Sequence, residues 1–204
     1  MRRFVVIGHR AITSGDFKLD DLAGGTGRLD VLLRCINSAF FLSHDIRRDA
    51  EITLILQGAP NPPKSIRLVG SELKYLNPDE RSTAALVRNA LIQKVAVEER
   101  SSPGIYISNR KYKDVLTNIP EGEQIVYLRE DGQDVRDFDF KDDVTFVLGD
   151  DQDLTPEEEE ALLAYGPQVI SLGPRSYHAD HCITIVNNEL DRRGPARAKV
   201  RAVP

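Results

Sequence analysis

Three short runs of apolar, mostly β-branched residues in the second half of the sequence limit the folds open to this chain. They are QIVYL (124–128), VTFVL (144–148) and QVISL (168–172). Runs of this length without polar alternation are typical of strands buried on both faces of a sheet. Between the last two runs, Thr155, Pro156 and Glu158 supply the N-cap, first-turn proline and capping box of a helix, and Gly166-Pro167 ends it. The pattern predicts parallel strands connected by helices.

The first half of the sequence extends this alternation. Apolar runs predict strands at 4–8, 52–56, 65–69 and 104–108. Helical periodicity and start signals predict helices at 28–42, at 77–97 with Asn77 as N-cap and Pro78 in the first turn, and at 111–119. A last helix is expected from Ser176 to Arg193, with an apolar stripe formed by Ala179, Cys182, Ile183, Val186 and Leu190. The expected fold is α/β, with a mainly parallel sheet covered by helices on both faces.

Composition narrows the class of protein. The chain has 204 residues and a net charge of −5, which argues against polyanion binding through total charge alone. The charge is uneven, with +3 on residues 1–100 and −8 on residues 101–204, and local arginines can still contact phosphates. No apolar run approaches the roughly 20 residues that cross a bilayer. Two cysteines are too few for a disulfide scaffold. We expect a soluble, cytoplasmic protein without a membrane partner.

The predicted topology indicates where a ligand would bind. In open α/β sheets, ligands bind beyond the carboxyl ends of the strands. In the second half of this chain, those ends are Leu128, Gly149 and Leu172-Gly173. Glycine at two of these ends lets a ligand approach the backbone closely.

The segment ISLGPRSYHADHC (170–182) has three possible interpretations. His178, His181 and Cys182 have the spacing of side chains on one helix face, but no Cys-x-x-Cys or His-Glu-x-x-His pair completes a metal site. Cys182 near a helix N-terminus is also a candidate nucleophile. The favoured interpretation is a strand-to-helix loop whose backbone groups hold a ligand, with Cys182 in the apolar wall and no metal.

Longer motifs carry a family resemblance. They are GRLDVLLRCINSAFFLSHDIRRD (27–49), GAPNPPKSIRLVGSELK (58–74), NPDER (77–81), PGIY (103–106) and HADHCITIVNNELD (178–191). Together they span most of the chain, which resembles the archaeal tRNA pseudouridine-54 N1-methyltransferases of the SPOUT superfamily. After Gly149 the sequence departs from many SPOUT members, because DDQD stands where they place a second glycine.

The resemblance implies a fold, a cofactor and a substrate. It implies a C-terminal deep trefoil knot within one SPOUT domain (1–204), whose first half (about 1–100) faces RNA and whose later part (about 120–193) holds S-adenosylmethionine. The implied substrate is pseudouridine in the T-loop of tRNA, and the implied assembly is a homodimer. The implied cofactor contacts are Leu128, Gly149, Leu172, Gly173, Pro174, Arg175, Ser176, Tyr177 and Cys182.

Methylation at N1 of pseudouridine also requires removal of the N1 proton. Asp45 in SHDIRRD is the first candidate for the base and Asp30 the second, although an aspartate among arginines is commonly a salt-bridged structural residue. Guanidinium groups grip phosphates, so the candidate RNA contacts are Arg28, Arg34, Arg47 and Arg48. The basic tail at 194–204 is a further contact or a solubilising end. Ribosomal RNA as the substrate, or a module that binds cofactor or RNA without turnover, are the alternatives.

Overall fold

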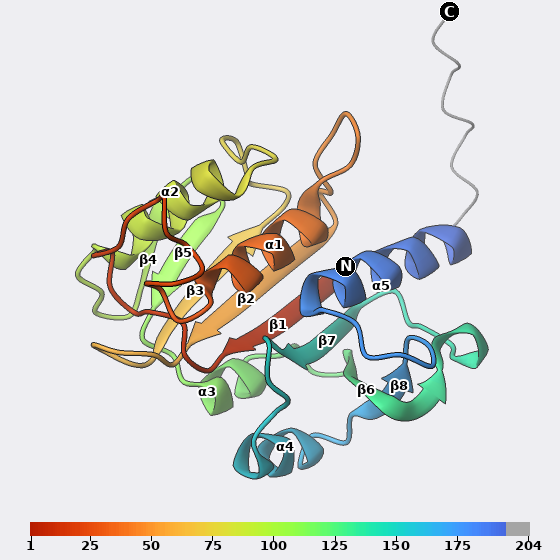
Figure 1. The fold of residues 1–204 in the computed structure, drawn as a ribbon. Coiled ribbons are helices and arrows are strands. Elements are labelled where there is room, and N and C mark those ends of the chain that lie inside the picture. The colour runs from red at the N-terminus through yellow and green to blue at the C-terminus, as the bar shows by residue number, and fades with distance from the viewer. Residues whose placement is uncertain (195–204) are drawn as a thin grey trace, which may run out of the picture.

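The computed structural model of this protein describes residues 1–194, so the predicted basic tail lies outside the described residues except for Gly194. Figure 1 shows a twisted sheet between two layers of helices. Within residues 1–194, no helix is long and apolar enough to cross a membrane.

Within the described part of the chain, eight strands form one sheet in the order β4-β5-β3-β2-β1-β7-β6-β8 (Figure 1). Their bounds are β1 Arg2–Gly8, β2 Ala50–Leu56, β3 Lys64–Val69, β4 Glu98–Ser102, β5 Ile105–Ser108, β6 Gln124–Asp134, β7 Val144–Gly149 and β8 Gln168–Ser171. Strands β2, β1, β7, β6 and β8 are parallel neighbours. Strands β3, β5 and β4 continue the sheet in antiparallel pairs. The prediction of a mainly parallel sheet is confirmed.

The register of the parallel strands defines two edges that matter for the site. Arg2 lies opposite Ala50 of β2 and Val144 of β7, while Ile7 lies opposite Gly149. The amino ends of these strands therefore share one edge and their carboxyl ends the other. The helices α1 and α4, which connect parallel strands, return the chain from the carboxyl edge to the amino edge.

Five helices among the described residues cover both faces of the sheet. They are α1 Leu29–Phe40, α2 Glu80–Leu91, α3 Tyr112–Thr117, α4 Pro156–Leu163 and α5 Ala179–Arg193, and a 3₁₀ turn spans Val135–Asp137. Helices α1, α2 and α5 pack over the larger core, and α3 and α4 cover the opposite face around Tyr112, Leu116 and Leu162 (Figure 1). This arrangement confirms the predicted layers, whereas the knot implied by the family resemblance stays a prediction.

Several predicted boundaries are wrong. Asp79, not Asn77, caps α2, because its side chain accepts a hydrogen bond from the backbone N–H of Ser82. That helix ends at Leu91, and the polar sequence EERSS forms the unpredicted strand β4. Helix α5 starts at Ala179, three residues later than predicted, because Ser176–His178 stay in the preceding loop. The capping box of α4, with Thr155 and Glu158, is confirmed.

Candidate functional site

A cavity of about 480 Å³ lies at the carboxyl edge of the last three parallel strands. Its walls come from the segments that follow β6, β7 and β8, as strand topology predicts. The lining residues are Leu128, Arg129, Glu130, Leu148, Gly149, Asp150, Asp151, Gln152, Asp153, Leu172, Arg175, Ser176, Tyr177, His178, Ala179 and Cys182. Seven of the nine predicted cofactor contacts line this cavity, and Gly173 and Pro174 lie in the same loop without lining it.

A bulge in β6 forms the first wall. Leu128 and Gln133 both lie opposite Ile170 of β8, so the intervening residues loop out of the ladder. Such bulges redirect side chains at the ends of strands. Here the bulge directs Arg129 and Glu130 to the cavity, where Glu130 accepts a hydrogen bond from Ser176 of the third wall. That hydrogen bond lowers the pKa of Glu130.

The second wall turns sharply at Gly149. A Cβ atom at this position would lie 2.0 Å from the backbone oxygen of Gln152. The glycine therefore makes room for the loop to fold back on itself, whereas the sequence suggested that it makes room for a ligand. The next residue, Asp150, has a fully buried side chain that holds His9.

The third wall is the loop between β8 and α5. Gly173 has φ of +141°, a conformation that side-chain-bearing residues rarely adopt. The hydroxyl of Ser171 donates to the carbonyl oxygen of Gly173 at 3.0 Å, which fixes the turn. The first turn of α5 then begins beside the cavity, with His178 at the N-cap and no side-chain capping bond. Its free N–H groups supply donors at this wall.

Cys182 lies in the first turns of α5 and lines the cavity. Its sulfur is 3.7 Å from the carbonyl oxygen of Tyr177. Burial raises the pKa of the thiol to about 11, so the sulfur is protonated near neutral pH and is a poor nucleophile. Among residues 1–194, no group of three His, Cys, Asp or Glu side chains has the arrangement of a metal site. The position of Cys182 in the wall and the raised pKa of its thiol favour the ligand-wall interpretation of the segment.

A cluster of charged residues at the start of α1 adjoins the cavity. Asp30 is buried and accepts hydrogen bonds from Arg28 at 3.0 Å and 3.2 Å and from Arg34 at 2.9 Å. Arg28 has φ of +69° and also lies 3.7 Å from Asp151 of the second wall. Burial opposes ionisation of Asp30, but the two arginines outweigh it and lower its pKa. Asp30 therefore stays ionised as the partner of two arginines and is a weak base.

Asp180, in the first turn of α5, is a buried carboxylate that was not predicted from the sequence. Its side chain faces Arg34, with Oδ1 3.9 Å from Nε. Within the described residues, Oδ1 has no hydrogen-bond partner. Unpartnered buried oxygens are uncommon in proteins and call for an explanation at each position.

The other predicted site residues lie at the amino edge of the sheet. Asp45 is on the exposed segment between α1 and β2, and its side chain accepts from the backbone N–H of Ile46. Arg47 is buried and pairs with Asp191 at the end of α5 through two hydrogen bonds of 2.8 Å and 2.5 Å. Arg48 donates to the carbonyl oxygens of Gly70 and Leu73. Within one chain, these residues and the cavity are therefore at opposite edges.

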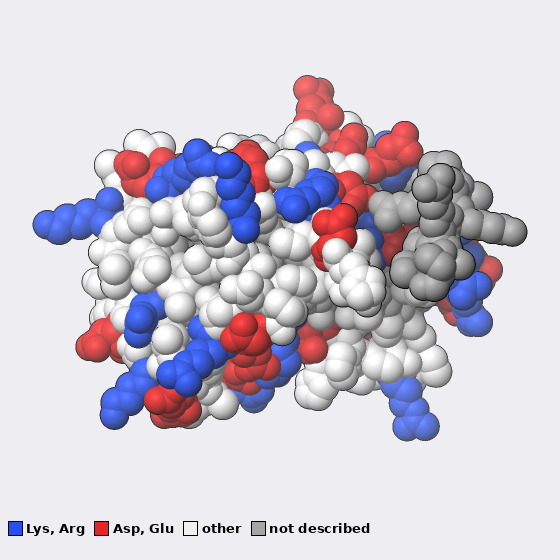
Figure 2. Space-filling view, turned by 90° about the horizontal axis from the view of Figure 1, so that it is seen from above, with Lys and Arg blue, Asp and Glu red and all other residues white. Residues whose placement is uncertain are grey.

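Charge on the surface is mixed. Figure 2 shows Lys and Arg side chains beside Asp and Glu side chains over the face seen from above. The face in this view is therefore not uniformly basic.

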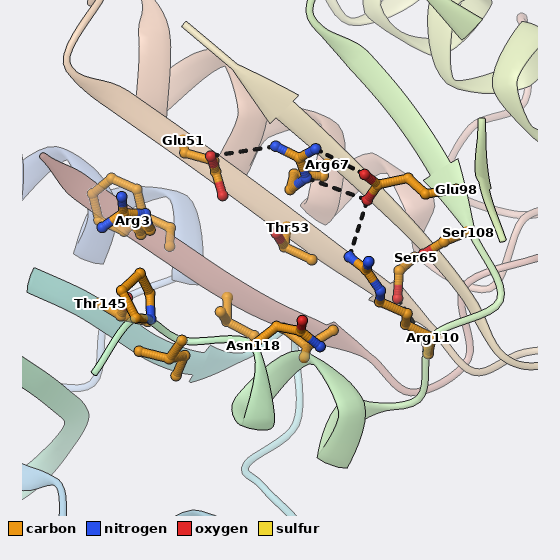
Figure 3. A pocket seen from close by; sticks show the side chains of 15 residues that line it. Arg3, Glu51, Thr53, Ser65, Arg67, Glu98, Ser108, Arg110, Asn118 and Thr145 are labelled. Atoms are coloured by element: carbon orange, nitrogen blue, oxygen red, sulfur yellow. Dashed lines mark hydrogen bonds and ion pairs between the residues drawn. The ribbon is translucent and has the colours of Figure 1, made fainter. Parts of the chain in front are cut away.

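A smaller cavity of about 270 Å³ lies over β2, β3 and β5, on the face that carries α3. Figure 3 shows Arg67 between Glu51 and Glu98, with Arg110 also directed at Glu98. Arg3 pairs with Glu123 at 2.5 Å. Because each of these arginines has a carboxylate partner, the network satisfies the polar face of the sheet and is not part of the carboxyl-edge site.

Comparison with known families identifies the chain. A family model described as "Putative SAM-dependent RNA methyltransferase" matches residues 1–194. The chain belongs to this family. The matched residues include the three walls of the cavity and the cluster at the start of α1.

Named relatives of this family member agree in length. A "tRNA (pseudouridine(54)-N(1))-methyltransferase" of Methanocella arvoryzae is 51% identical over 195 residues, which cover 95% of this chain and 100% of the relative. Proteins with the same description from Methanosarcina acetivorans and Haloferax volcanii are 49% and 47% identical, and the alignments cover 98% and 97% of this chain and 95% and 100% of those relatives. The resemblance inferred from the motifs is confirmed.

A solved structure supports the fold of the family member. The crystal structure of Archaeoglobus fulgidus Nep1 bound to S-adenosylhomocysteine matches with a TM-score of 0.63 and 16% sequence identity. The match covers 94% of this chain and 96% of that chain. At this identity, the likeness establishes the fold alone.

Besides Asp180, a cluster of four residues beside the site of this methyltransferase was not predicted from the sequence. They are His9, Gln57, Asp150 and Glu158, which meet in one hydrogen-bonded cluster behind the second wall. His9 and Asp150 are separated by 141 positions in the sequence. No local motif marks such a contact, and the only available signal was the position of each residue just beyond a predicted strand or within a capping box.

Proposed function

We propose that this protein transfers a methyl group from S-adenosylmethionine to N1 of pseudouridine 54 in the T-loop of tRNA. The supporting observation is the 51% identity to the Methanocella arvoryzae tRNA (pseudouridine(54)-N(1))-methyltransferase, over the whole length of that relative. The cavity at the carboxyl edge has the size and the partly apolar walls of a small-molecule site.

The cofactor would occupy the cavity at the carboxyl edge. Its apolar wall includes Leu128, Leu172 and Cys182, which would hold the adenine ring, and the lining part of the loop at Arg175–Tyr177 would supply backbone groups. The lining has more carboxylates than guanidinium groups even without the buried Asp150, since it includes the acids Glu130, Asp151 and Asp153 and the arginines Arg129 and Arg175. This excess suits a ligand whose sulfonium and ammonium groups outnumber its carboxylate. The residues present therefore fit S-adenosylmethionine.

The chemistry assigns three tasks to the protein. Pseudouridine is joined to its ribose through carbon, so N1 carries a proton that must leave before or during methylation. When bound, the cofactor supplies an electrophilic methyl group. The chain must align N1 with that group, accept or relay the N1 proton, and stabilise the charge that develops on the base.

Arg28 and Arg34 are the best-placed predicted RNA contacts. Asp30 orients both guanidinium groups beside the cavity, and their side chains remain 38% and 32% exposed. They would position a phosphate or a carbonyl oxygen of the target nucleotide. Arg48 is a more distant contact for the RNA backbone. We assign Arg47 to structure, because its guanidinium is buried against Asp191.

Three aspartates are candidates for the proton acceptor. Asp45 is exposed but lies across the sheet from the cavity of its own chain. Asp30 is close to the cavity, yet its lowered pKa makes it a weak base. Asp180 has a buried oxygen without a partner beside Arg34, which leaves an acceptor for a donor on the base. Comparison of Asp30→Asn, Asp45→Asn and Asp180→Asn in single-turnover assays ranks them, since loss of the base lowers the rate of methyl transfer and not cofactor affinity.

The organisation of the whole protein follows the same proposal. One domain carries an RNA-facing first half (about 1–100) and a knotted cofactor part (about 120–193), and two copies form the active homodimer. A tRNA substrate places the enzyme in the cytoplasm. Sedimentation equilibrium tests the assembly, and a monomer that retains full activity would contradict it.

Methyl incorporation into two matched tRNAs tests the function. One tRNA carries pseudouridine at position 54 and the other uridine, and nucleoside mass spectrometry identifies the product. Transfer only to the first, giving N1-methylpseudouridine, is the expected result. Cofactor binding without transfer to either tRNA would move the substrate to ribosomal RNA, and absence of transfer to any RNA would indicate a module without turnover. Gly173→Val should abolish transfer, which separates catalysis from a contaminating activity.

A further inference from the structure

Two buried carboxylates converge on one imidazole behind the second wall of the cavity. His9 directly follows β1, and its Nδ1 is 3.0 Å from Oδ1 of Asp150. Its Nε2 is 2.9 Å from Oε2 of Glu158 in the first turn of α4. The exposed fractions of the three side chains are 9%, 0% and 11%, so water does little to screen their charges.

The hydrogen bonds around this cluster define its protonation state. An ionised carboxylate only accepts hydrogen bonds, so each ring nitrogen of His9 must donate. Asp150 also accepts from the backbone N–H groups of His9 and Gln152, at 3.1 Å and 3.2 Å. Glu158 also accepts from the side chain of Gln57 at 2.7 Å and from the backbone N–H of Thr155 at 2.9 Å. His9 is therefore an imidazolium between two carboxylates.

Other elements add little to the charge that faces the ring. Burial is the main cause of a raised pKa for Tyr112 of α3, and the nearby Glu158 carboxylate raises it further. Tyr112 therefore stays neutral. The next residue in the second wall, Asp151, forms ion pairs with Arg10 and Arg28. The hydrogen bond that His9 donates to Asp150 raises the pKa of His9 to about 9. Burial opposes this increase, and the hydrogen bond to Glu158 adds to it.

The cluster is connected to the cavity through Asp150. This residue directly follows Gly149 and begins the segment Asp150–Asp153, all of whose residues line the cavity. Its buried carboxylate has no other side-chain partner among the described residues than His9. The imidazolium thus joins the end of β1, the segment after β7 and the start of α4. It does so without touching the cavity, because His9 is not among the lining residues.

We propose that His9 is a positioning residue whose ring fixes the segment Asp150–Asp153 as the second wall of the cofactor cavity. The inference rests on the proposed function, since it takes that cavity to hold S-adenosylmethionine or its product. Without the ring, two buried carboxylates face each other with no cation between them, and like charges in a dry site repel strongly. The segment then moves to reach water, and the wall loses its shape.

Calorimetric titration with S-adenosylhomocysteine, without RNA, tests this role in the full chain. His9→Gln is expected to weaken binding about tenfold to 100-fold near pH 7, the range that follows from leaving a buried charged group unpaired. His44→Gln is the matched control, because it changes an exposed histidine at the amino edge. The double variant His9→Gln with Glu158→Gln removes one of the facing charges and should recover part of the affinity. Circular dichroism establishes that each variant is folded.

The pH dependence of binding separates positioning from a general structural defect. The affinity of the unchanged protein should fall as the pH rises through about 9, where His9 loses one of its two N–H donors. His9→Gln should lack this decrease, and titration of the ligand's amino group affects both proteins equally. Unchanged affinity in His9→Gln, or the same pH profile in both proteins, would overturn the proposal. So would an unchanged protein that does not bind the ligand.

The two proposals fail in different ways. If affinity responds to His9 as expected but no tRNA is methylated, the proposed substrate is wrong and the positioning role stands. If tRNA is methylated while His9→Gln retains normal affinity, the function stands and the positioning role is wrong. With saturating S-adenosylmethionine, His9→Gln should retain most of the maximal rate, because the ring touches neither the cofactor nor the base.

Discussion

Replacement of His9 by glutamine should change how the stability of this protein depends on pH. The flanking carboxylates raise the pKa of His9 from 6.5 to about 9. Between these values the folded protein retains a proton that the unfolded chain releases, so folding binds a proton and becomes less favourable as the pH rises. The stabilisation is complete below pH 6.5 and is lost as the pH rises through about 9.

The magnitude follows from that interval. A difference of one pKa unit corresponds to about 1.4 kcal/mol, so the full interval corresponds to about 3 kcal/mol. The side chain of His9 is only 9% exposed, which keeps solvent screening small. Since domains are commonly stable by about 5–15 kcal/mol, the effect is a large part of the total.

Urea unfolding followed by circular dichroism measures it. The unchanged protein, His9→Gln and His44→Gln are unfolded at several values from about pH 6 to about pH 9.5, across the range in which His9 titrates. The free energy of unfolding of the unchanged protein should exceed that of His9→Gln by about 3 kcal/mol more at the lower limit than at the upper. The His44→Gln control should follow the unchanged protein. A difference between the unchanged protein and His9→Gln that is the same at both limits would refute the assignment of an imidazolium.

Three further changes test other parts of the structure. Gly173→Val should abolish binding of S-adenosylhomocysteine in calorimetry. Gly122 also has a positive φ, of +80°, but lies far from the cavity. Gly122→Val should therefore lose only about 1–2 kcal/mol of stability in urea unfolding and no affinity for the ligand. Asp30→Asn should lower kcat/KM for tRNA at least about tenfold while cofactor affinity stays within about twofold, and a parallel loss of both would contradict the division of the site. Arg47→Ala should cost about 2 kcal/mol in urea unfolding by removing the buried one of the two arginines that pair with Asp191, the other being Arg2. A cost below about 0.5 kcal/mol would show that the pair is not structural.

Local patterns in the sequence were sufficient for the parts of the fold that depend on neighbouring residues. The apolar runs at β6, β7 and β8, and the capping box of α4, each carry their signal within a few positions. The strand ends then placed Leu128, Gly149 and Leu172 around one cavity, because parallel topology brings carboxyl ends together.

Features that depend on distant partners were not predictable in the same way. Strand β4 has the polar sequence EERSS and owes its conformation to pairing with β5. The bulge in β6 is defined by its register against β8, about 40 residues further along the chain. His9 has no significance until Asp150 and Glu158 are folded against it. Asp45 was chosen for its basic neighbours in sequence, whereas the return of α1 to the amino edge places it away from the cavity.

The order of the strands also has a consequence for self-association. An edge strand invites another copy to pair with it, and proteins prevent this with charges, bulges and short edges. Here one edge is β4, which carries Glu98, Glu99 and Arg100 and has an irregular register near Ser102. The other edge is β8, with only four residues. Neither edge is a good template for a further strand, so the proposed homodimer should form through helices and loops and leave each sheet at its present width.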